Sequence, residues 1–246
     1  MNIDYVDNKK IMITKETYKF DTDWYSKNGS IYEMESLELF YNFVNNYIKN
    51  TNNDKINIID IGAHTGIYTL YSKFLNNSNY YSFEPQIKAH DNLKDNILLN
   101  NISNVNLFNY GLSDKKCNGI LKVPGGDKGL ATLALNPLRM EKNPNTYDIF
   151  LDTIDNCFFD KNINVDFIKI DTEGHEYFIL KGGNKTINKY KPLIQLEFNY
   201  LNLKQFNLTQ KNVEDYLKSI DYILINKCKE EHIFSHKNKK YLYFNN

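Results

Sequence analysis

The sequence predicts an α/β fold: a mostly parallel sheet with helices on both faces and an antiparallel last hairpin. From residue 56 onward, short β-branched and aromatic runs alternate with segments of helical length. This alternation is typical of parallel strands joined by helical crossovers. In addition, the run at 56–60 leads directly into Gly62-x-x-x-Gly66, a pattern expected where a strand turns into a helix.

The predicted elements can be placed along the whole chain. We expect helices at 34–48, 66–75, 87–100, 176–188 and 213–220, and strands at 56–60, 80–83, 105–110, 165–170, 192–198, 222–225 and 240–244. Further β segments within 119–133 and 147–154 belong to an insertion at about 117–160, whose glycine-rich part is 124–129. We expect this insertion to lie on the substrate side of the domain.

A polar loop at 50–54 divides the chain into an N-terminal extension, 1–54, and the main domain, 55–246. Within the extension, the apolar spacing at 34–48 predicts a helix packed on the sheet. For Trp24 two interpretations stay open: a lid residue over a ligand, or an aromatic residue of the core.

The composition limits the classes of function that we expect for the chain. The 246 residues carry 30 basic and 30 acidic side chains, so the formal net charge is zero, which gives no global electrostatic case for nucleic-acid or membrane-surface binding. The three cysteines, Cys117, Cys157 and Cys228, have no metal-ligand spacing and an odd count, so no disulfide framework is expected. Without an apolar run of membrane-spanning length or a signal-peptide profile, we expect a cytoplasmic location.

The turn after the strand at 56–60 is a candidate ligand cradle, with the sequence Asp60-x-Gly62-Ala63-His64-x-Gly66. Its glycines let the backbone approach a ligand, and the first N–H groups of the next helix are expected to lack internal partners. The turn does not have the Gly-x-Gly-x-x-Gly pattern of nicotinamide dinucleotide sites, and the Asp60 carboxylate would repel phosphate. The same carboxylate suits a cationic group such as a sulfonium, which points to S-adenosylmethionine.

Glu84 is the second candidate ligand residue. It ends the strand predicted at 80–83 and stands 24 positions after Asp60. In dinucleotide-binding turns an acid about 20 residues further on accepts hydrogen bonds from ribose hydroxyls. Glu84 fits that role.

A third block, Lys169-x-Asp171-x-Glu173-Gly174-His175-Glu176, follows the apolar strand at 165–170. Ligands of open α/β sheets bind beyond the carboxyl ends of the strands, so these side chains are expected to face the same crevice as Asp60 and Glu84.

Together the blocks resemble the FkbM-type family of S-adenosylmethionine-dependent methyltransferases, over roughly residues 55–200. The resemblance is carried by residues Asp60, Gly62, Ala63, Gly66, Tyr68, Thr69, Leu70, Phe83, Glu84, Pro85, Leu112, Ser113, Asp114, Lys169, Asp171, Glu173, Gly174, Glu176, Leu180 and Gly182. It implies a class I, Rossmann-like methyltransferase fold and O-methylation of a hydroxyl on a sugar, polyketide or other small metabolite. The cofactor site it implies comprises Asp60, Gly62, Ala63, His64, Gly66, Glu84, Ser113, Asp114 and Asp171.

Transfer of a methyl group to an ordinary alcohol requires a base near the methyl group. Asp171 is the expected base, with His175 or Glu173 as substitutes if Asp171 instead binds the methionine amino group. Lys169 either forms a structural ion pair with Glu197 or Asp171, or helps to orient and activate the acceptor hydroxyl.

Three alternatives remain open. The group Asp171, Glu173, His175, Glu176 and Glu197 would suit magnesium or manganese, although no metal is the favoured prediction; Glu176 alone fits the first turn of the next helix. An RNA ribose 2′-O-methyltransferase would use Lys55 or Lys73 with Asp171, a lysine and Glu197, but the neutral charge and the 169–174 block disfavour it. A catalytically silent scaffold is disfavoured because Asp60, Glu84 and Asp171 are all present.

Overall fold

A computed structural model describes residues 2–4, 9–14, 33–53, 55–75, 77–124, 130–135 and 144–244. The interpretation of Trp24 and the expected glycine-rich loop from Gly125 to Gly129 lie outside these residues. Among the described residues, no helix combines the length and the apolar character that a membrane crossing requires.

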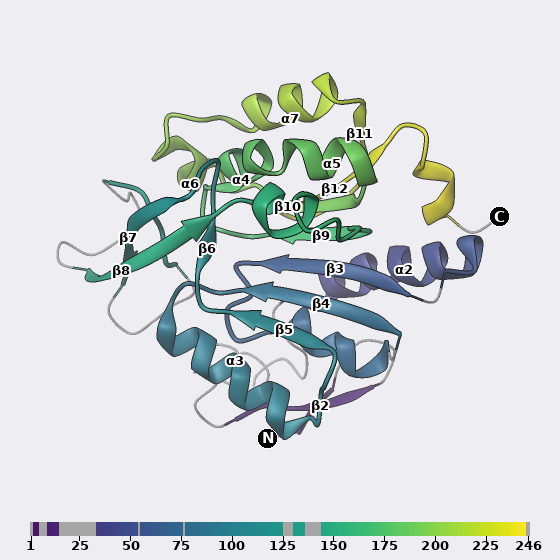
Figure 1. The fold of residues 1–246 in the computed structure, drawn as a ribbon, viewed down its shortest axis with the longest axis horizontal. Helices are drawn as coiled ribbons and strands as arrows, with labels where there is room; N and C mark the ends of the chain where they lie inside the picture. Colours follow the sequence, from purple (N-terminus) through teal and green to yellow (C-terminus); the bar gives the residue numbers. More distant parts are fainter. Residues whose placement is uncertain are drawn as a thin grey trace.

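The centre of the molecule is a seven-stranded sheet with the order β11-β12-β10-β9-β3-β4-β5 (Figure 1). Its strands are β3 (Ile56–Ile61), β4 (Ser78–Phe83), β5 (Val105–Phe108), β9 (Phe167–Ile170), β10 (Leu193–Glu197), β11 (Tyr222–Cys228) and β12 (Glu231–His236). All pair in parallel except β12, which is antiparallel to both β10 and β11. The predicted mostly parallel sheet with an antiparallel final hairpin is therefore confirmed.

The strand order contains a topological switch point between β3 and β9. From β3 the chain adds β4 and β5 on one side, then crosses over to add β9 and β10 on the other. In open α/β sheets ligands bind at such a point, beyond the carboxyl ends of the strands. The residues that follow β3 and β9 are therefore the candidates for ligand binding.

Side chains alternate between two apolar layers, one on each face of the sheet. Ile56 and Ile58 of β3 pack with residues of α2 (Met34–Thr51), whereas Ile59 and Ile61 face α4 (Glu176–Gly182) and α5 (Asn184–Tyr190). The other helices are α3 (Ile87–Leu99), α6 (Tyr200–Lys204), α7 (Gln210–Ser219), the 3-10 helices η2 (Thr69–Phe74) and η4 (Lys240–Tyr243), and the π-helix η3 (Asp155–Phe159). Helices on both faces are thus confirmed.

The predicted insertion supplies two strands of a separate three-stranded sheet, and the third strand lies just before the insertion in the chain. The strands of this sheet are β6 (Gly111–Leu112), β7 (Cys117–Val123) and β8 (Asn145–Asp152), in the order β6-β8-β7. Figure 1 shows β7 and β8 on the side toward which β3, β4 and β5 point. The small sheet also meets the 169–176 block directly, because the Thr132 hydroxyl donates a hydrogen bond to the carbonyl oxygen of Glu173 (3.3 Å).

The start of the chain is held against the domain by two asparagine side chains. The hairpin of β1 (Asn2–Asp4) and β2 (Lys10–Met12) leads to Thr14. Asn100 exchanges two hydrogen bonds with the backbone of Met12, and the Asn96 side chain accepts one from the N–H of Thr14. These amides replace the backbone partners that a neighbouring strand would offer.

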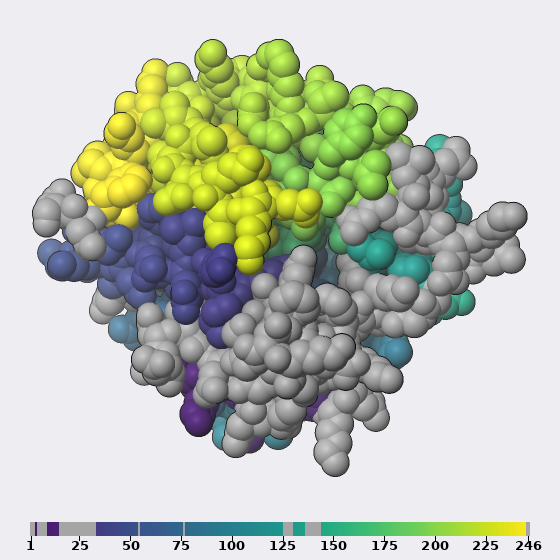
Figure 2. All heavy atoms as spheres, turned by 180° about the vertical axis from the view of Figure 1, so that it is seen from behind, coloured from purple at the N-terminus to yellow at the C-terminus, as the bar shows by residue number. Residues whose placement is uncertain are grey.

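Two predicted elements are wrong. Residues 240–244 were expected to be the last strand, but that strand is β12 and 240–243 form the 3-10 helix η4. The aromatic residues of this segment pack on α2 instead, and Asn46 and Asn50 donate to the carbonyl oxygens of 242–244. The view from behind shows the yellow C-terminal residues against dark blue α2 (Figure 2).

The second difference concerns 66–75, which was expected to be one helix. Only Thr69–Phe74 is helical, as a short 3-10 helix. The Thr69 hydroxyl donates to Asp60, and the Tyr71 ring stacks on Tyr41 at 3.5 Å between centroids. We attribute the tighter winding to these contacts with the sheet and α2. The helix expected at 176–188 is likewise divided, at Gly183, into α4 and α5.

Candidate functional site

The ends of β3 and β9 touch through their backbones at the switch point. Gly62 has a φ of +78°, and a Cβ at this position would overlap the backbone carbonyl oxygen of Asp171. The N–H of Asp171 in turn donates to the carbonyl of Ile61 (3.0 Å). Position 62 therefore requires glycine, because the absence of a Cβ lets the backbone of Asp171, at the end of β9, contact the turn.

Four N–H groups of the turn after β3 donate to partners within the chain. The N–H groups of Gly62 and Ala63 donate to the carbonyl of Phe83, and the N–H of Gly66 donates to that of Ala63. The N–H of His64 donates to a carboxylate oxygen of Glu84 (2.8 Å). Because these four donors are used internally, they are not available to bind a phosphate group.

Glu84 is buried and holds two segments together. One carboxylate oxygen accepts from the N–H of His64, and the other accepts from the N–H of Gln86 (2.7 Å). His64 itself has a left-handed backbone, with φ 48°. The carboxylate is thus fixed beside the turn, between the N–H groups of His64 and Gln86.

Asp60 is buried below this turn rather than open to the crevice. Its carboxylate accepts a hydrogen bond from the Thr69 hydroxyl (2.6 Å), and the same hydroxyl lies 2.6 Å from that of Ser82. Burial raises the pKa of Asp60, while the ammonium of Lys169, its partner residue on β9, opposes the rise. Lys169 is thus one positive charge of the chain that acts on the Asp60 carboxyl group.

Lys169 forms the central ion pair. It is 3% exposed, and its Nζ lies 2.8 Å from Oδ2 of Asp171 and 3.8 Å from Oε1 of Glu231. The ammonium also lies 4.5 Å from the centre of the Tyr68 ring. Burial alone would lower the pKa of Lys169, but Asp171 and Glu231 raise it well above its ordinary value.

Asp171 and Glu197 were the two ion-pair partners expected for Lys169. Asp171 does contact the ammonium, but the second acid near it is Glu231 rather than Glu197. Sequence reasoning missed Glu231 because the final strand was placed at 240–244. A correctly placed hairpin would have revealed it, since Glu231 is the first residue of β12 and lies directly opposite Glu197.

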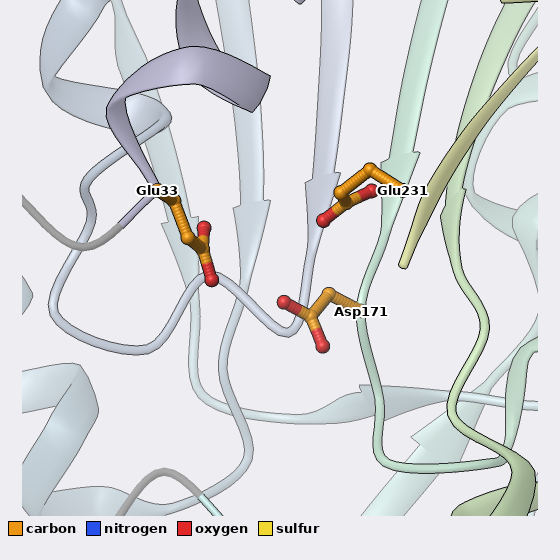
Figure 3. Close-up of side chains that lie close together, drawn as sticks. All are labelled: Glu33, Asp171 and Glu231. Atoms are coloured by element: carbon orange, nitrogen blue, oxygen red, sulfur yellow. The ribbon is translucent and has the colours of Figure 1, made fainter. Parts of the chain in front are cut away.

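Carboxylates gather around Asp171 in two groups that share it. In one, oxygens of Glu33, Asp171 and Glu231 all lie within 4.8 Å of one another. Figure 3 shows these three side chains pointing toward one another from three different parts of the chain. In the other group, oxygens of Asp171, Glu173 and Glu197 meet the same limit. Burial and the neighbouring acids, Asp171 first, raise the pKa of Glu197 well above its ordinary value.

The loop after Asp171 is held in shape by Glu176. Glu173 and Gly174 have positive φ angles of 56° and 103°, and a Cβ on Gly174 would overlap the carbonyl of Asn202. The buried Glu176 carboxylate accepts hydrogen bonds from the N–H and hydroxyl of Thr172 and from the N–H of Gly174, each at 3.1 Å. Glu176 begins α4, as expected, but its charge stabilises this loop rather than only the helix terminus.

His175 does not join the carboxylates around Asp171. Its Nε2 lies 2.9 Å from the hydroxyl oxygen of Ser113, which donates to Asp114 (3.1 Å), and its ring stacks on Phe178. Burial lowers the pKa of His175 to about 4. The structure thus brings Ser113 and Asp114 together with the neutral imidazole of His175, apart from the expected base.

Lys73, one of the two further lysines considered for an RNA ribose methyltransferase, is directed elsewhere, and the lysine at Asp171 is Lys169. Lys73 reaches instead toward the side-chain oxygen of Asn100 (3.3 Å) and the Phe74 ring. Asn100 belongs to the part of the domain that holds the N-terminal hairpin. This placement weighs against the RNA alternative.

Comparisons with known proteins agree with this geometry. The model of the methyltransferase FkbM domain matches residues 60–224, which is more than half of the chain. No match was found among curated proteins. The methyltransferase FkbM from Methylobacillus flagellatus KT shares 19% identity, with a TM-score of 0.50 over 74% of this chain and 44% of that one.

A second solved structure, the bifunctional kinase-methyltransferase WbdD, shares 11% identity, with a TM-score of 0.52 over 92% of this chain and 44% of that one. At such identities the two structures show a common fold. The chain spans less than half the length of both proteins. The sequence blocks, the class I methyltransferase fold and the matching domain model lead to one conclusion: the chain belongs to the FkbM family of methyltransferases.

Proposed function

We propose that the chain transfers a methyl group from S-adenosylmethionine to a hydroxyl group of a sugar or other small metabolite. The observation that carries this proposal is the position of Asp171. It follows β9 at the switch point, touches the Gly62 turn and is held by Lys169 at 2.8 Å. A carboxylate at this point is suited to accept a proton from a hydroxyl next to the cofactor.

The residues around the turn fit S-adenosylmethionine better than a diphosphate. The N–H groups of Gly62, Ala63 and Gly66 already donate within the chain, so these three would not bind a diphosphate. A cationic amino acid portion with an ammonium and a sulfonium requires acceptors and negative charge. In addition, the buried Thr65 hydroxyl forms no hydrogen bond within the described part of the chain, as expected of a group that awaits a ligand.

The proposed assignments follow the geometry of the crevice. Glu84 would accept hydrogen bonds from the ribose hydroxyls, since its carboxylate is held beside the turn that follows β3. The cluster of Ser113, Asp114 and His175 would bind the adenine, because a neutral imidazole and a hydroxyl complement its amino group and ring nitrogens. These roles stay close to the sequence prediction, except that His175 moves from the list of bases to the cofactor side.

When bound, the cofactor supplies an electrophilic methyl group. The chain has to orient the acceptor oxygen in line with it and to remove the hydroxyl proton. Oδ2 of Asp171 is engaged by Lys169, so Oδ1 would accept that proton. The ion pair fixes the carboxylate plane, which keeps the proton acceptor aligned.

Measurement of S-adenosylhomocysteine release against a panel of sugar and small-molecule alcohols tests this proposal. We expect turnover by the wild type and a loss of about 100-fold or more in kcat for Asp171→Asn with cofactor binding retained. Glu38→Gln, a change at an exposed position of α2, is the matched control and should keep full activity. Near-normal turnover by Asp171→Asn would assign the base to another residue.

A further inference from the structure

We propose that Asn96 of α3 couples the docking of the N-terminal segment, residues 9–14, to cofactor binding at the turn after β3. The inference rests on the proposed function for the identity of the ligand. Asn96 would act through the backbone of the turn rather than on the reacting atoms, so it is a positioning residue. A bound cofactor and a docked N-terminal segment would then stabilise each other.

The Asn96 side chain forms a bridge between two distant parts of the chain. It is 0% exposed, its Oδ1 accepts a hydrogen bond from the N–H of Thr14 (2.9 Å), and its Nδ2 donates to the carbonyl oxygen of Thr65 (3.0 Å). Because one partner is a donor and the other is an acceptor, together they fix the orientation of the amide. An apolar side chain at this position could hold neither partner.

The turn depends on such support because part of its backbone is in an unfavourable region. His64 has a φ of 48°, which is uncommon for a residue with a Cβ, and Gly66 has a φ of +96°. Glu84 holds the N–H of His64, and Asn96 holds the carbonyl oxygen of Thr65, the next residue. Release of the Asn96 amide would therefore loosen the turn at the point where its backbone is least favourable.

The same helix packs directly against both parts of the chain. A Cβ on Gly66 would overlap the side chain of Leu93, three residues before Asn96 in α3. Asn100, which follows α3, exchanges two hydrogen bonds with the backbone of Met12. Residues three and four apart lie on one face of a helix, so this face contacts the turn at one end and the N-terminal segment at the other.

A second connection joins the N-terminal segment to the residues that follow the turn. The ammonium of Lys9 donates to the Tyr71 hydroxyl (3.0 Å) and lies 4.7 Å from the centre of its ring. The Tyr71 ring stacks on Tyr41, whose hydroxyl donates to the carbonyl oxygen of Tyr68 (2.7 Å). Docking of the segment therefore supports the backbone on both sides of Gly66.

The coupling has to be reciprocal. If the docked segment favours the turn conformation that binds the cofactor, a bound cofactor favours the docked segment by the same factor. Such couplings typically change an affinity by about 5- to 150-fold. The buried Thr65 hydroxyl, which forms no hydrogen bond within the described part of the chain, lies at the end of the bridge where the cofactor is proposed to bind.

Hydrogen-deuterium exchange of the full chain, with and without S-adenosylhomocysteine, tests the inference. The N–H groups of Met12 and Thr14 report docking, because side-chain oxygens of α3 and its C-cap accept from them. We expect the ligand to slow exchange at residues 9–14 by about 5-fold or more in the wild type. In Asn96→Leu this slowing should be lost, and the affinity measured by calorimetry should fall by a similar factor.

Asn104→Leu is the matched control. It removes another amide that holds backbone carbonyl oxygens, those of Ser72 and Leu75, without contact to the turn or to residues 9–14. This variant should keep both the affinity and the slowing of exchange. If Asn96→Leu does not fold, as checked by near-ultraviolet circular dichroism, Thr14→Pro removes only the N–H donor of the bridge and should also lower the affinity.

A purely structural role of Asn96 would give a different result. Asn96→Leu would then lower the free energy of unfolding in urea but leave the affinity unchanged, and the ligand would not alter exchange at residues 9–14. That result would overturn the inference while the proposed function stands. Absence of binding by the wild type would overturn the proposed function, and this inference with it.

Discussion

The backbone carbonyl of Asp171 occupies the place where a side chain on Gly62 would begin. This contact joins the ends of β3 and β9 at the switch point of the sheet. This single contact explains both why the turn contains a glycine and why Asp171 lies next to the turn. The candidate site depends on this contact, since the proposed base and the turn proposed to bind the cofactor meet there.

Gly62→Ala is expected to destabilise the protein by about 2–4 kcal/mol. The added methyl group would overlap the Asp171 carbonyl, and the φ of +78° is unfavourable for any residue with a Cβ. Urea unfolding measures the loss. Gly119→Ala in β7 is the control, because its Cβ would meet only side-chain atoms, at 3.1 Å from Leu151. Equal losses in both variants would contradict the account.

Lys169→Met should destabilise the protein by about 3–5 kcal/mol, because it leaves the buried carboxylates of Asp171 and Glu231 without their cation. The double variant Lys169→Met/Glu231→Gln should recover part of this loss. A double-mutant cycle by urea unfolding gives the coupling energy. Strict additivity of the two single changes would show that Lys169 and Glu231 do not interact.

Glu176 gives the stability a predictable pH dependence. Burial raises its pKa to about 7, so between about pH 4.5 and 7 the folded state keeps a proton that the unfolded state has released. The contribution of Glu176 is therefore greatest below about pH 4.5 and decreases as the pH rises through this window, by about 3 kcal/mol.

In Glu176→Gln this decrease should be absent. The amide oxygen can still accept from Thr172 and Gly174, so the loop is preserved. Free energies of unfolding measured from pH 4.5 to 7.5 should agree for wild type and variant at low pH, where the wild-type carboxyl group is protonated, and differ at high pH, where the wild type is the less stable of the two. A constant difference across the range would exclude titration of Glu176 in this window.

Glu84→Gln is expected to weaken S-adenosylmethionine binding by about 1–3 kcal/mol, or about 5- to 150-fold, because a charged acceptor for the ribose is replaced by a neutral one. Glutamine is preferable to alanine here, since loss of the whole side chain would also release the N–H groups of His64 and Gln86. Calorimetry measures the affinity. Unchanged affinity in folded protein would remove Glu84 from the ribose role.

Much of the fold could be predicted because local signals agree with it. The alternation of strands and helices, the glycine turn at Gly62 and the acids that end the core strands all follow from short sequence patterns. The last strand could not be predicted in this way. Residues 240–244 have strand-like character but lie on α2, and Glu231–His236, the true strand, alternates less clearly because it is buried along its whole length.

The sequence predicted most residues of the candidate site, but not which of them contact one another. Asp171 and Lys169 form the expected ion pair, since they are two residues apart at one strand end. The separation of His175 from Asp171 depends on the reversal at Glu173 and Gly174, which turns the ring toward Ser113. The participation of Glu231 depends on strand pairing between distant segments, and no local pattern reports it.

Cofactor binding is the central claim, and isothermal calorimetry of the purified, metal-free chain tests it most directly. S-adenosylmethionine and S-adenosylhomocysteine should each bind in the micromolar range at one site per chain, and NAD, the control, should not bind. Absence of binding by both sulfur compounds to folded protein, with and without Mg²⁺, would contradict the account.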